Sequence, residues 1–178
     1  MKFTPTTLSD VILIEPQVFK DDRGFFFESY RRQIFVDNGI RVEFVQDNHS
    51  RSAKGALRGL HFQTPPHEQA KLIGVVRGEI FDVVVDARKG SKTYGKHVTL
   101  TLSAENRKMV YIPAGFAHGF LSMAEGTEVL YKVSDIYSPS HERGIRWDDP
   151  ALAIAWPKLN VPYVFSEKDK HFPSLKEI

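Results

Sequence analysis

The chain has 178 residues, a net charge of +2 and no cysteine. A chain of this length can enclose one core without covalent cross-links, so we expect one domain spanning residues 1–178. The absence of cysteine excludes disulfides, thiolate nucleophiles and cysteine-ligated metals and is typical of a cytoplasmic protein, and the scattered charges predict no nucleic-acid partner.

The first apolar segment, MKFTPTTLSDVILIEP at residues 1–16, is short and is broken by Asp10 and Glu15. It has the form of neither a signal peptide nor a membrane span, so we expect no membrane contact. Weak helical signals follow in YRRQIFVDNG, at residues 30–39, and at the end of the chain in SEKDKHFPSLKEI, at residues 166–178.

Between these two segments the chain is a series of short β patterns separated by turns. Strands are predicted at residues 57–63, 71–76, 80–88, 96–103, 109–112, 116–123 and 127–135. Gly78 lies at the bend of a tight turn between the second and third of these. Many short strands without intervening helices predict an all-β sandwich or barrel with a few short helices.

The segment TEVLYKVSD carries an aromatic hydroxyl on a strand pattern. Side chains alternate between the two faces of a strand, so Val129, Tyr131 and Val133 share one face. If that face is the interior of a barrel, the hydroxyl of Tyr131 points into the lumen.

Two histidines also lie in strand patterns. His118 lies in PAGFAHGF, whose Pro-x-Gly-x-x-His spacing is similar to the second motif of the cupin barrels. The first cupin motif is a glycine, five residues and then His-x-His; here Gly55 is followed after five residues by His61, but Gln63 replaces the second histidine.

The cupin motif continues with a glutamate and, after six residues, a glycine. Here six residues separate Lys71 from Gly78, so a lysine stands where the glutamate would be. An ammonium group has no lone pair and repels a cation, whereas transition metals take imidazoles and carboxylates as ligands. We therefore expect a cupin pocket without its metal. On its own, Lys71 would be read as a solvated surface lysine.

Several polar residues have ordinary structural interpretations. Arg23 and Glu28 flank three phenylalanines in DDRGFFFESY, and FVQDNHS contains three polar residues that would suit a strand end with an Asx turn. Ser166 and Asp169 have the spacing of a capping box, which favours Asp169 as an acidic residue in the first turn of a helix.

Eight segments, in order along the chain, resemble the dTDP-4-dehydrorhamnose 3,5-epimerase family. They are VFKDDRGFFFESY, FVQDNHS, LRGLHFQ, QAKLIGVVRGEIFDVVVDAR, LSAEN, YIPAGFAHGF, YKVSDIYSP and WDDPALAIAWP. The resemblance implies a metal-free, cupin-type β-barrel (jelly roll) that needs no cofactor and acts on a dTDP-4-keto-6-deoxyhexose. It also implies a homodimer, to which we expect the N-terminal segment to contribute.

The resemblance also implies roles for individual residues. His61 resembles the proton acceptor, Tyr131 the proton donor, Asp169 the partner of the histidine and Lys71 the residue beside the C4 oxygen. The implied substrate contacts are Lys71 together with Arg23, Glu28, Gln46, Asp47, Asn48, Arg58, His118, Glu142 and Lys168.

The implied reaction suits these residue types. C3 and C5 flank the C4 ketone, so their protons are acidified by enolate formation, and inversion needs a base on one face and an acid on the other. Histidine titrates near neutral pH and suits a base, whereas a tyrosine phenol is protonated there and suits an acid. The arginine fork suits a diphosphate.

Other functions share parts of this pattern. A relative that inverts only one carbon, or a related keto-isomerase, would have the same pocket. A metal-dependent cupin oxygenase would bind iron or another metal, against which Gln63 and Lys71 argue. A non-catalytic sugar-nucleotide binding protein would exchange no substrate hydrogens.

Overall fold

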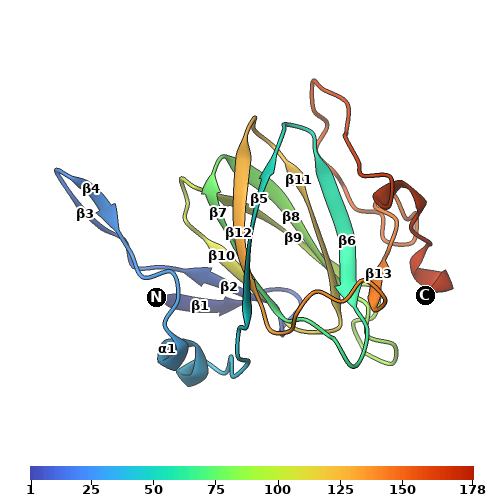
Figure 1. The fold of residues 1–178 in the computed structure, drawn as a ribbon, viewed down its shortest axis with the longest axis horizontal. Coiled ribbons are helices and arrows are strands. Elements are labelled where there is room, and N and C mark those ends of the chain that lie inside the picture. The colour runs from blue at the N-terminus through green and yellow to red at the C-terminus, as the bar shows by residue number, and fades with distance from the viewer.

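A computed structural model describes residues 1–178, and β-strands dominate it. One sheet contains, in spatial order, β1 (Lys2–Pro5), β2 (Ile12–Glu15), β10 (Met109–Ile112), β7 (Lys71–Arg77), β12 (Thr127–Val133) and β5 (Gln46–Ser52). The second contains β13 (Glu142–Gly144), β6 (Leu57–Gln63), β11 (Phe116–Ser122), β8 (Glu79–Asp86) and β9 (His97–Ser103). The two sheets face each other as a barrel (Figure 1), which confirms the all-β architecture predicted from the sequence.

The alternation along β8 shows why this sequence forms a buried strand. Ile80 and Val84 belong to the core cluster between the two sheets, whereas Val83 and Val85 belong to a cluster on the outer face of the second sheet. Successive side chains of a strand point to opposite faces, and both faces of β8 are covered. Asp82 lies between Ile80 and Val84 on the inner face and is fully buried.

Three apolar clusters hold the layers together. The largest lies between the sheets, and a second packs α1 (Arg32–Asp37), through Phe35, against the outer face of the first sheet. The third covers the outer face of the second sheet with the C-terminal part of the chain, including Ile145, Leu152 and Leu175. The inner space at one end of the barrel is therefore left for polar side chains.

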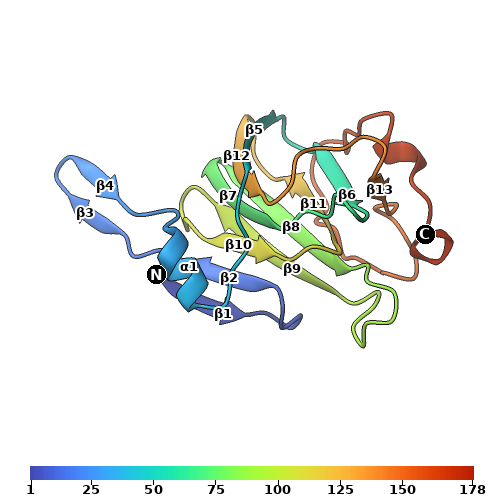
Figure 2. The same ribbon diagram turned by 60° about the horizontal axis from the view of Figure 1, so that its bottom comes forward.

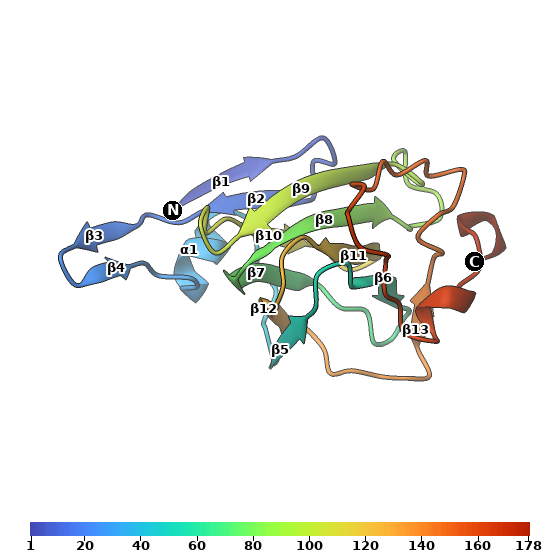
Figure 3. The same cartoon turned by 90° about the horizontal axis from the view of Figure 1, so that it is seen from above.

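The C-terminal segment differs from the expected helix. Residues 166–178 form two short 3-10 helices, η1 (Asp169–His171) and η2 (Leu175–Glu177), because Pro173 between them cannot continue a helix. Before it, Val164 forms an isolated parallel bridge with Ala56, at the start of β6. Seen from above, this segment passes along the second sheet to the end of the molecule opposite the N-terminus (Figure 3).

A two-stranded hairpin stands apart from the barrel. It consists of β3 (Phe19–Asp21) and β4 (Gly24–Phe26), and it projects beyond all other elements in each view (Figures 1 and 2). We call residues 19–26 the N-terminal hairpin. Its phenylalanines Phe19, Phe25 and Phe26 are 58%, 57% and 65% exposed.

Most predicted strands are confirmed, as is the turn at Gly78, whose φ of +74° favours glycine. The strands at residues 2–5, 12–15, 46–52 and 142–144 and the N-terminal hairpin lacked a clear alternating pattern. These strands are short, or they carry polar side chains on the face that points into the barrel, so no apolar alternation marks them. No helix is long and apolar enough to cross a membrane.

Candidate active site

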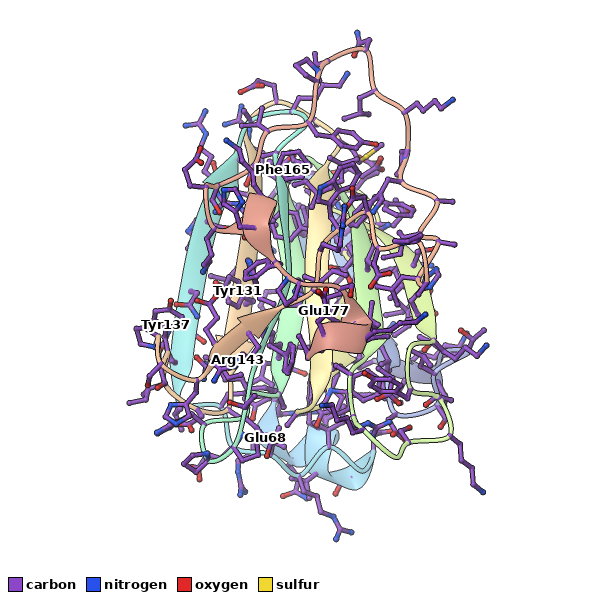
Figure 4. The ribbon with its side chains drawn as sticks, turned by 90° about the vertical axis from the view of Figure 1, so that its right-hand side faces the viewer. Glu68, Tyr131, Tyr137, Arg143, Phe165 and Glu177 are labelled. Atoms are coloured by element: carbon purple, nitrogen blue, oxygen red, sulfur yellow. The ribbon has the colours of Figure 1, made fainter.

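A cavity of about 610 Å³ opens between the two sheets at one end of the barrel. Its polar lining comes from both sheets and from the C-terminal segment, and consists of Ser50, Arg58, His61, Lys71, His118, Tyr131, Tyr137, Glu142, Ser166, Lys168 and Asp169. This volume lies within the range of pockets that bind small molecules. Figure 4 shows the C-terminal segment in front of the strands, with Tyr131 near the centre, Tyr137 to one side and Phe165 above.

His61 lies on β6 and is paired with a carboxylate from the C-terminal segment. Its Nε2 lies 2.6 Å from Oδ1 of Asp169, and the edge of the Phe172 ring packs against the imidazole, with ring centroids 5.3 Å apart. A carboxylate only accepts hydrogen bonds, so Nε2 carries the proton and Nδ1, which has no partner in the chain, is left as the basic nitrogen.

Asp169 is held in its ionised form. Burial opposes ionisation, but the hydrogen bond from His61 and the nearby charge of Lys168 outweigh it, so the pKa of Asp169 is lowered. The backbone N–H of Asp169 also donates to Oγ of Ser166 at 3.2 Å, so the predicted capping contact exists alongside the contact to His61.

Tyr131 lies on β12, in the sheet opposite His61. As predicted, it shares the inner face of its strand with Val129 and Val133, and it lines the cavity. Its hydroxyl makes no hydrogen bond within the chain. Burial raises the pKa of the Tyr131 phenol, with Arg58 opposing this effect, so the phenol keeps its proton at neutral pH.

Lys71 enters the cavity from the start of β7. Its Nζ donates to the backbone oxygen of His61 at 3.5 Å, a long hydrogen bond. Burial lowers the pKa of Lys71 to about 8, against the opposing charges of Glu142 and Asp82. Lys71 is thus a cavity lysine rather than a solvated surface lysine.

His118 forms a second histidine–carboxylate pair beside the first. It is the direct cross-strand partner of His61, and its Nε2 lies 2.6 Å from Oδ2 of Asp82 on β8. The side chains of His118 and Asp82 are 8% and 0% exposed, respectively. The sequence singled out His118 but assigned no function to Asp82.

Cationic groups gather toward the cavity mouth. Lys168 donates to both carboxylate oxygens of Glu142 at 2.7 Å, and the hydroxyl of Tyr137 donates to Oε2 of Glu142 at 2.8 Å. The guanidinium of Arg58 is held by Oγ of Ser52 and the backbone oxygen of Arg51. Burial opposes the ionisation of Glu142, but Lys168 and Tyr137 outweigh it and its pKa is lowered.

The donor set does not fit a metal ion. No group of three or more histidine, aspartate or glutamate side chains is arranged to hold one. The amide of Gln63 is committed to the backbone, since Nε2 donates to His67 and Ile136 and Oε1 accepts from Ser138. The ammonium group of Lys71 lines the same space.

Not every residue implied by the resemblance reaches the cavity. Gln46 and Asn48 line a recess of about 150 Å³ that shares His61, Lys71 and Tyr131 with the main cavity. The side chain of Asp47 is exposed on the outer face of β5, where it pairs with Lys132. Arg23 lies in the N-terminal hairpin, paired with Asp21, and Glu28 follows the hairpin and lies 3.7 Å from Arg31. Neither residue lines the cavity.

Several lining residues were not predicted. They are Ser50, Phe120, Tyr137, Phe165 and Ser166. Tyr137 and Phe165 lie in turn-rich segments whose course over the barrel no local pattern reveals. Ser50 follows Gln46 and Asn48 on the inner face of β5, where three polar side chains give no apolar alternation from which the strand could be predicted.

Sequence and structure comparisons give consistent matches. A family model described as dTDP-4-dehydrorhamnose 3,5-epimerase matches residues 5–177. The protein of that name from Pseudomonas aeruginosa is 55% identical over 171 residues, which cover 96% of this chain and 93% of the relative. A dTDP-6-deoxy-D-glucose-3,5-epimerase from Legionella pneumophila, solved in complex with dTDP-4-keto-L-rhamnose, superposes with a TM-score of 0.96 at 44% identity, covering 99% of this chain and 94% of that one.

A more distant solved structure has a related activity. The 3′-monoepimerase from Streptomyces bikiniensis, in complex with dTDP-quinovose, superposes with a TM-score of 0.90 at 35% identity. That alignment covers 97% of this chain and 87% of the other. The fold described above is therefore shared by proteins whose names specify inversion at two carbons and at one.

Proposed function

Because the chain belongs to the dTDP-4-dehydrorhamnose 3,5-epimerase family, it is an isomerase, and we propose how its cavity performs the reaction. The substrate is a dTDP-4-keto-6-deoxyhexose, dTDP-4-dehydro-6-deoxy-D-glucose, and C3 and C5 are inverted to give dTDP-4-dehydro-L-rhamnose. The observation that carries this assignment is the placement of His61 and Tyr131, which enter one cavity from opposite sheets.

In this proposal His61 is the base. Nδ1 takes the proton from C3 or C5, and Asp169 holds Nε2–H, which fixes the ring and stabilises the imidazolium that forms. A well-placed base of this kind contributes roughly 10²–10⁴-fold to the rate. The electron pair of the broken C–H bond moves into the enolate, whose negative charge lies on the C4 oxygen.

Lys71 stabilises that oxygen, and Tyr131 completes the inversion. A preorganised donor at a developing oxyanion is worth about 3–4 kcal/mol in other enzymes. Tyr131 then donates its proton to the opposite face of the carbon. His61 then releases the abstracted proton to solvent and Tyr131 regains a proton from solvent, which resets both groups for the second carbon. No electrons are transferred, so the reaction needs no redox cofactor.

The remaining polar residues bind the nucleotide in this proposal. Arg58 and Lys168 present positive charge to the diphosphate, and Gln46 and Asn48 provide amides in the adjoining recess. Binding energy from the diphosphate, remote from the reacting carbons, holds the sugar against His61.

We also propose that residues 1–178 form one cupin-like domain that pairs as a homodimer. Arg23 and Glu28 lie on or beside the exposed N-terminal hairpin, away from their own cavity, so they can act as substrate contacts only if the hairpin reaches a second copy. Its exposed phenylalanines support burial in such an interface. Light scattering should give a dimer, and replacing Phe26 with aspartate should weaken it; a monomer would refute this part. The cytoplasmic location stays a prediction.

The reaction itself is tested by incubating the protein with the dTDP-4-keto sugar in D₂O and following deuterium at each carbon. Label at both C3 and C5 is the expected result. Label at only one carbon would favour the single-carbon epimerase, which the Streptomyces bikiniensis structure makes a specific alternative. An absence of label would leave only a binding function.

A further inference from the structure

Asp82 is an acidic residue among apolar core residues. It lies in the middle of β8, is 0% exposed, and its neighbours on the same face, Ile80 and Val84, belong to the core between the sheets. A buried carboxylate costs several kcal/mol unless other groups compensate its charge. Its presence therefore needs a physical reason.

One oxygen of this carboxylate has a partner and the other does not. Oδ2 accepts from Nε2 of His118 at 2.6 Å, whereas Oδ1 is buried without any hydrogen-bond partner in the chain. Because the carboxylate can only accept, it fixes the proton of His118 on Nε2. Nδ1 of His118 has no partner within the chain and is left for the cavity that this residue lines.

The geometry points to Asp82 as a positioning residue for the epimerase reaction, which orients His118 and places a buried negative charge, with one oxygen unpartnered, behind the cavity that Lys71 enters. The inference rests on the proposed function and deepens it, since Asp82 itself lies behind the residues that line the cavity. Without that charge, Lys71 would more readily become a neutral amine and lose its hold on the enolate oxygen.

Two carboxylates support the positive charge of Lys71, Glu142 with the larger effect and Asp82 with the smaller. The titratable groups that share the cavity with Lys71 or lie behind it are Arg58, His61, Asp82, His118, Tyr131, Tyr137, Glu142, Lys168 and Asp169. Burial lowers the pKa of Lys71, and only Glu142 and Asp82 oppose this effect. Glu142 shares its charge with Lys168 at 2.7 Å, whereas the only hydrogen-bond partner of Asp82 is an imidazole.

A purely structural role makes a different prediction. If Asp82 served only to satisfy a buried histidine, asparagine would do as well, because its amide oxygen has the same reach and accepts the same hydrogen bond. Asp82→Asn therefore separates the charge from the shape. The substitution also leaves every cavity-lining residue unchanged.

The test is the pH dependence of deuterium incorporation by Asp82→Asn. For the unaltered protein we expect kcat to fall on the alkaline side, near the Lys71 pKa of about 8. In Asp82→Asn this fall should move to lower pH by about 0.5–1 unit, which lowers kcat by no more than about two-fold at pH 7 and by about 3- to 10-fold well above pH 8, with KM little changed. Asp169→Asn is the matched control, since it should slow exchange without moving the alkaline fall.

The outcomes distinguish this inference from the proposed function. No exchange by the unaltered protein would refute the function itself, whereas an unchanged alkaline fall in Asp82→Asn would refute only the role of Asp82. If Asp82→Asn does not fold, the inference is tested instead by ¹⁵N NMR spectra of the histidines in the unaltered protein. The His118 signal, assigned by its loss in His118→Asn, should show the Nε2–H tautomer, and an Nδ1–H tautomer would overturn the inference.

Discussion

Two histidines lie side by side in one sheet, and each is paired with an aspartate at 2.6 Å, but the two pairs have different surroundings. The side chain of His61 is 26% exposed, whereas that of His118 is 8% exposed and its aspartate is completely buried. Asp169 comes from the C-terminal segment, outside both sheets, and Asp82 comes from the neighbouring strand. The hydrogen-bond distance alone therefore does not identify a base; access to the cavity and the origin of the carboxylate distinguish the two.

The largest expected effect on activity comes from replacing each of the two histidines in turn with asparagine. His61→Asn should lower deuterium incorporation at both C3 and C5 by roughly 10²–10⁴-fold, because the base is lost. His118→Asn should slow exchange less, since His61 remains. If His118→Asn abolished deuterium exchange while His61→Asn retained it, His118 and not His61 would be the base.

The second test removes only the charge of the carboxylate in the first pair. Asp169→Asn should reduce exchange by about 10²-fold or more, because the neutral amide no longer stabilises the imidazolium that forms when His61 takes the proton. Binding of dTDP, measured by calorimetry, should change little. Equal losses of binding and exchange would mean that Asp169 shapes the cavity rather than supporting the base.

The third test leaves both pairs intact and removes the acid from the opposite sheet. Tyr131→Phe should lower net inversion about 10-fold more than it lowers exchange, because His61 can still return a proton to the original face. Both quantities are read from the same D₂O incubation, by mass and by product configuration. Inversion of both carbons at the parent rate would show that Tyr131 is not the donor.

Lys71 connects the two pairs. Its Nζ contacts the backbone of His61, and its positive charge is partly balanced by Asp82. Its pKa in the folded protein is about 8, below the ordinary value of 10.5, so between these values the unfolded chain binds more protons and stability rises with pH. Lys71→Met should therefore be more stable near neutral pH by roughly 1–3 kcal/mol while losing activity.

Urea denaturation at several pH values checks this prediction. The advantage of Lys71→Met should shrink as the pH rises from about 8 to 10.5, because Lys71 of the folded parent then loses its charge while the unfolded chain still keeps the proton. An advantage that did not depend on pH would instead indicate better packing by methionine.

The smallest expected effect concerns the support of the first pair alone. A Cβ on Gly144 would lie 2.5 Å from the ring of Phe172, which packs against His61. Gly144→Ala should therefore cost about 1–3 kcal/mol of stability and slow exchange a few-fold. Gly74→Ala is the control, because its Cβ would meet the flexible side chain of Met109 at 3.3 Å, away from both pairs. An equal loss of deuterium exchange in Gly74→Ala would show that the contact between Phe172 and His61 does not support catalysis.

The sequence predicted the central strands well because their apolar residues alternate or are continuous. It could not predict β5, whose inward residues Gln46, Asn48 and Ser50 are polar because they line the cavity and its recess. Asp169 shows why local reading is incomplete: its backbone makes the predicted capping contact, and its side chain serves a residue 108 positions away. Asp82 was visible in a strand pattern, but only the tertiary structure shows what it faces.

The position of Asp169 late in the sequence has a consequence for the order in which the protein folds during synthesis. Both sheets are complete at Gly144, whereas the partner of His61 follows later, on a segment that joins them through an isolated bridge, a few side-chain hydrogen bonds and apolar packing. During synthesis the two sheets can therefore pair before the segment that completes the cavity wall and supports His61 has left the ribosome. The scaffold and the activation of the base thus reside in separate stretches of the chain.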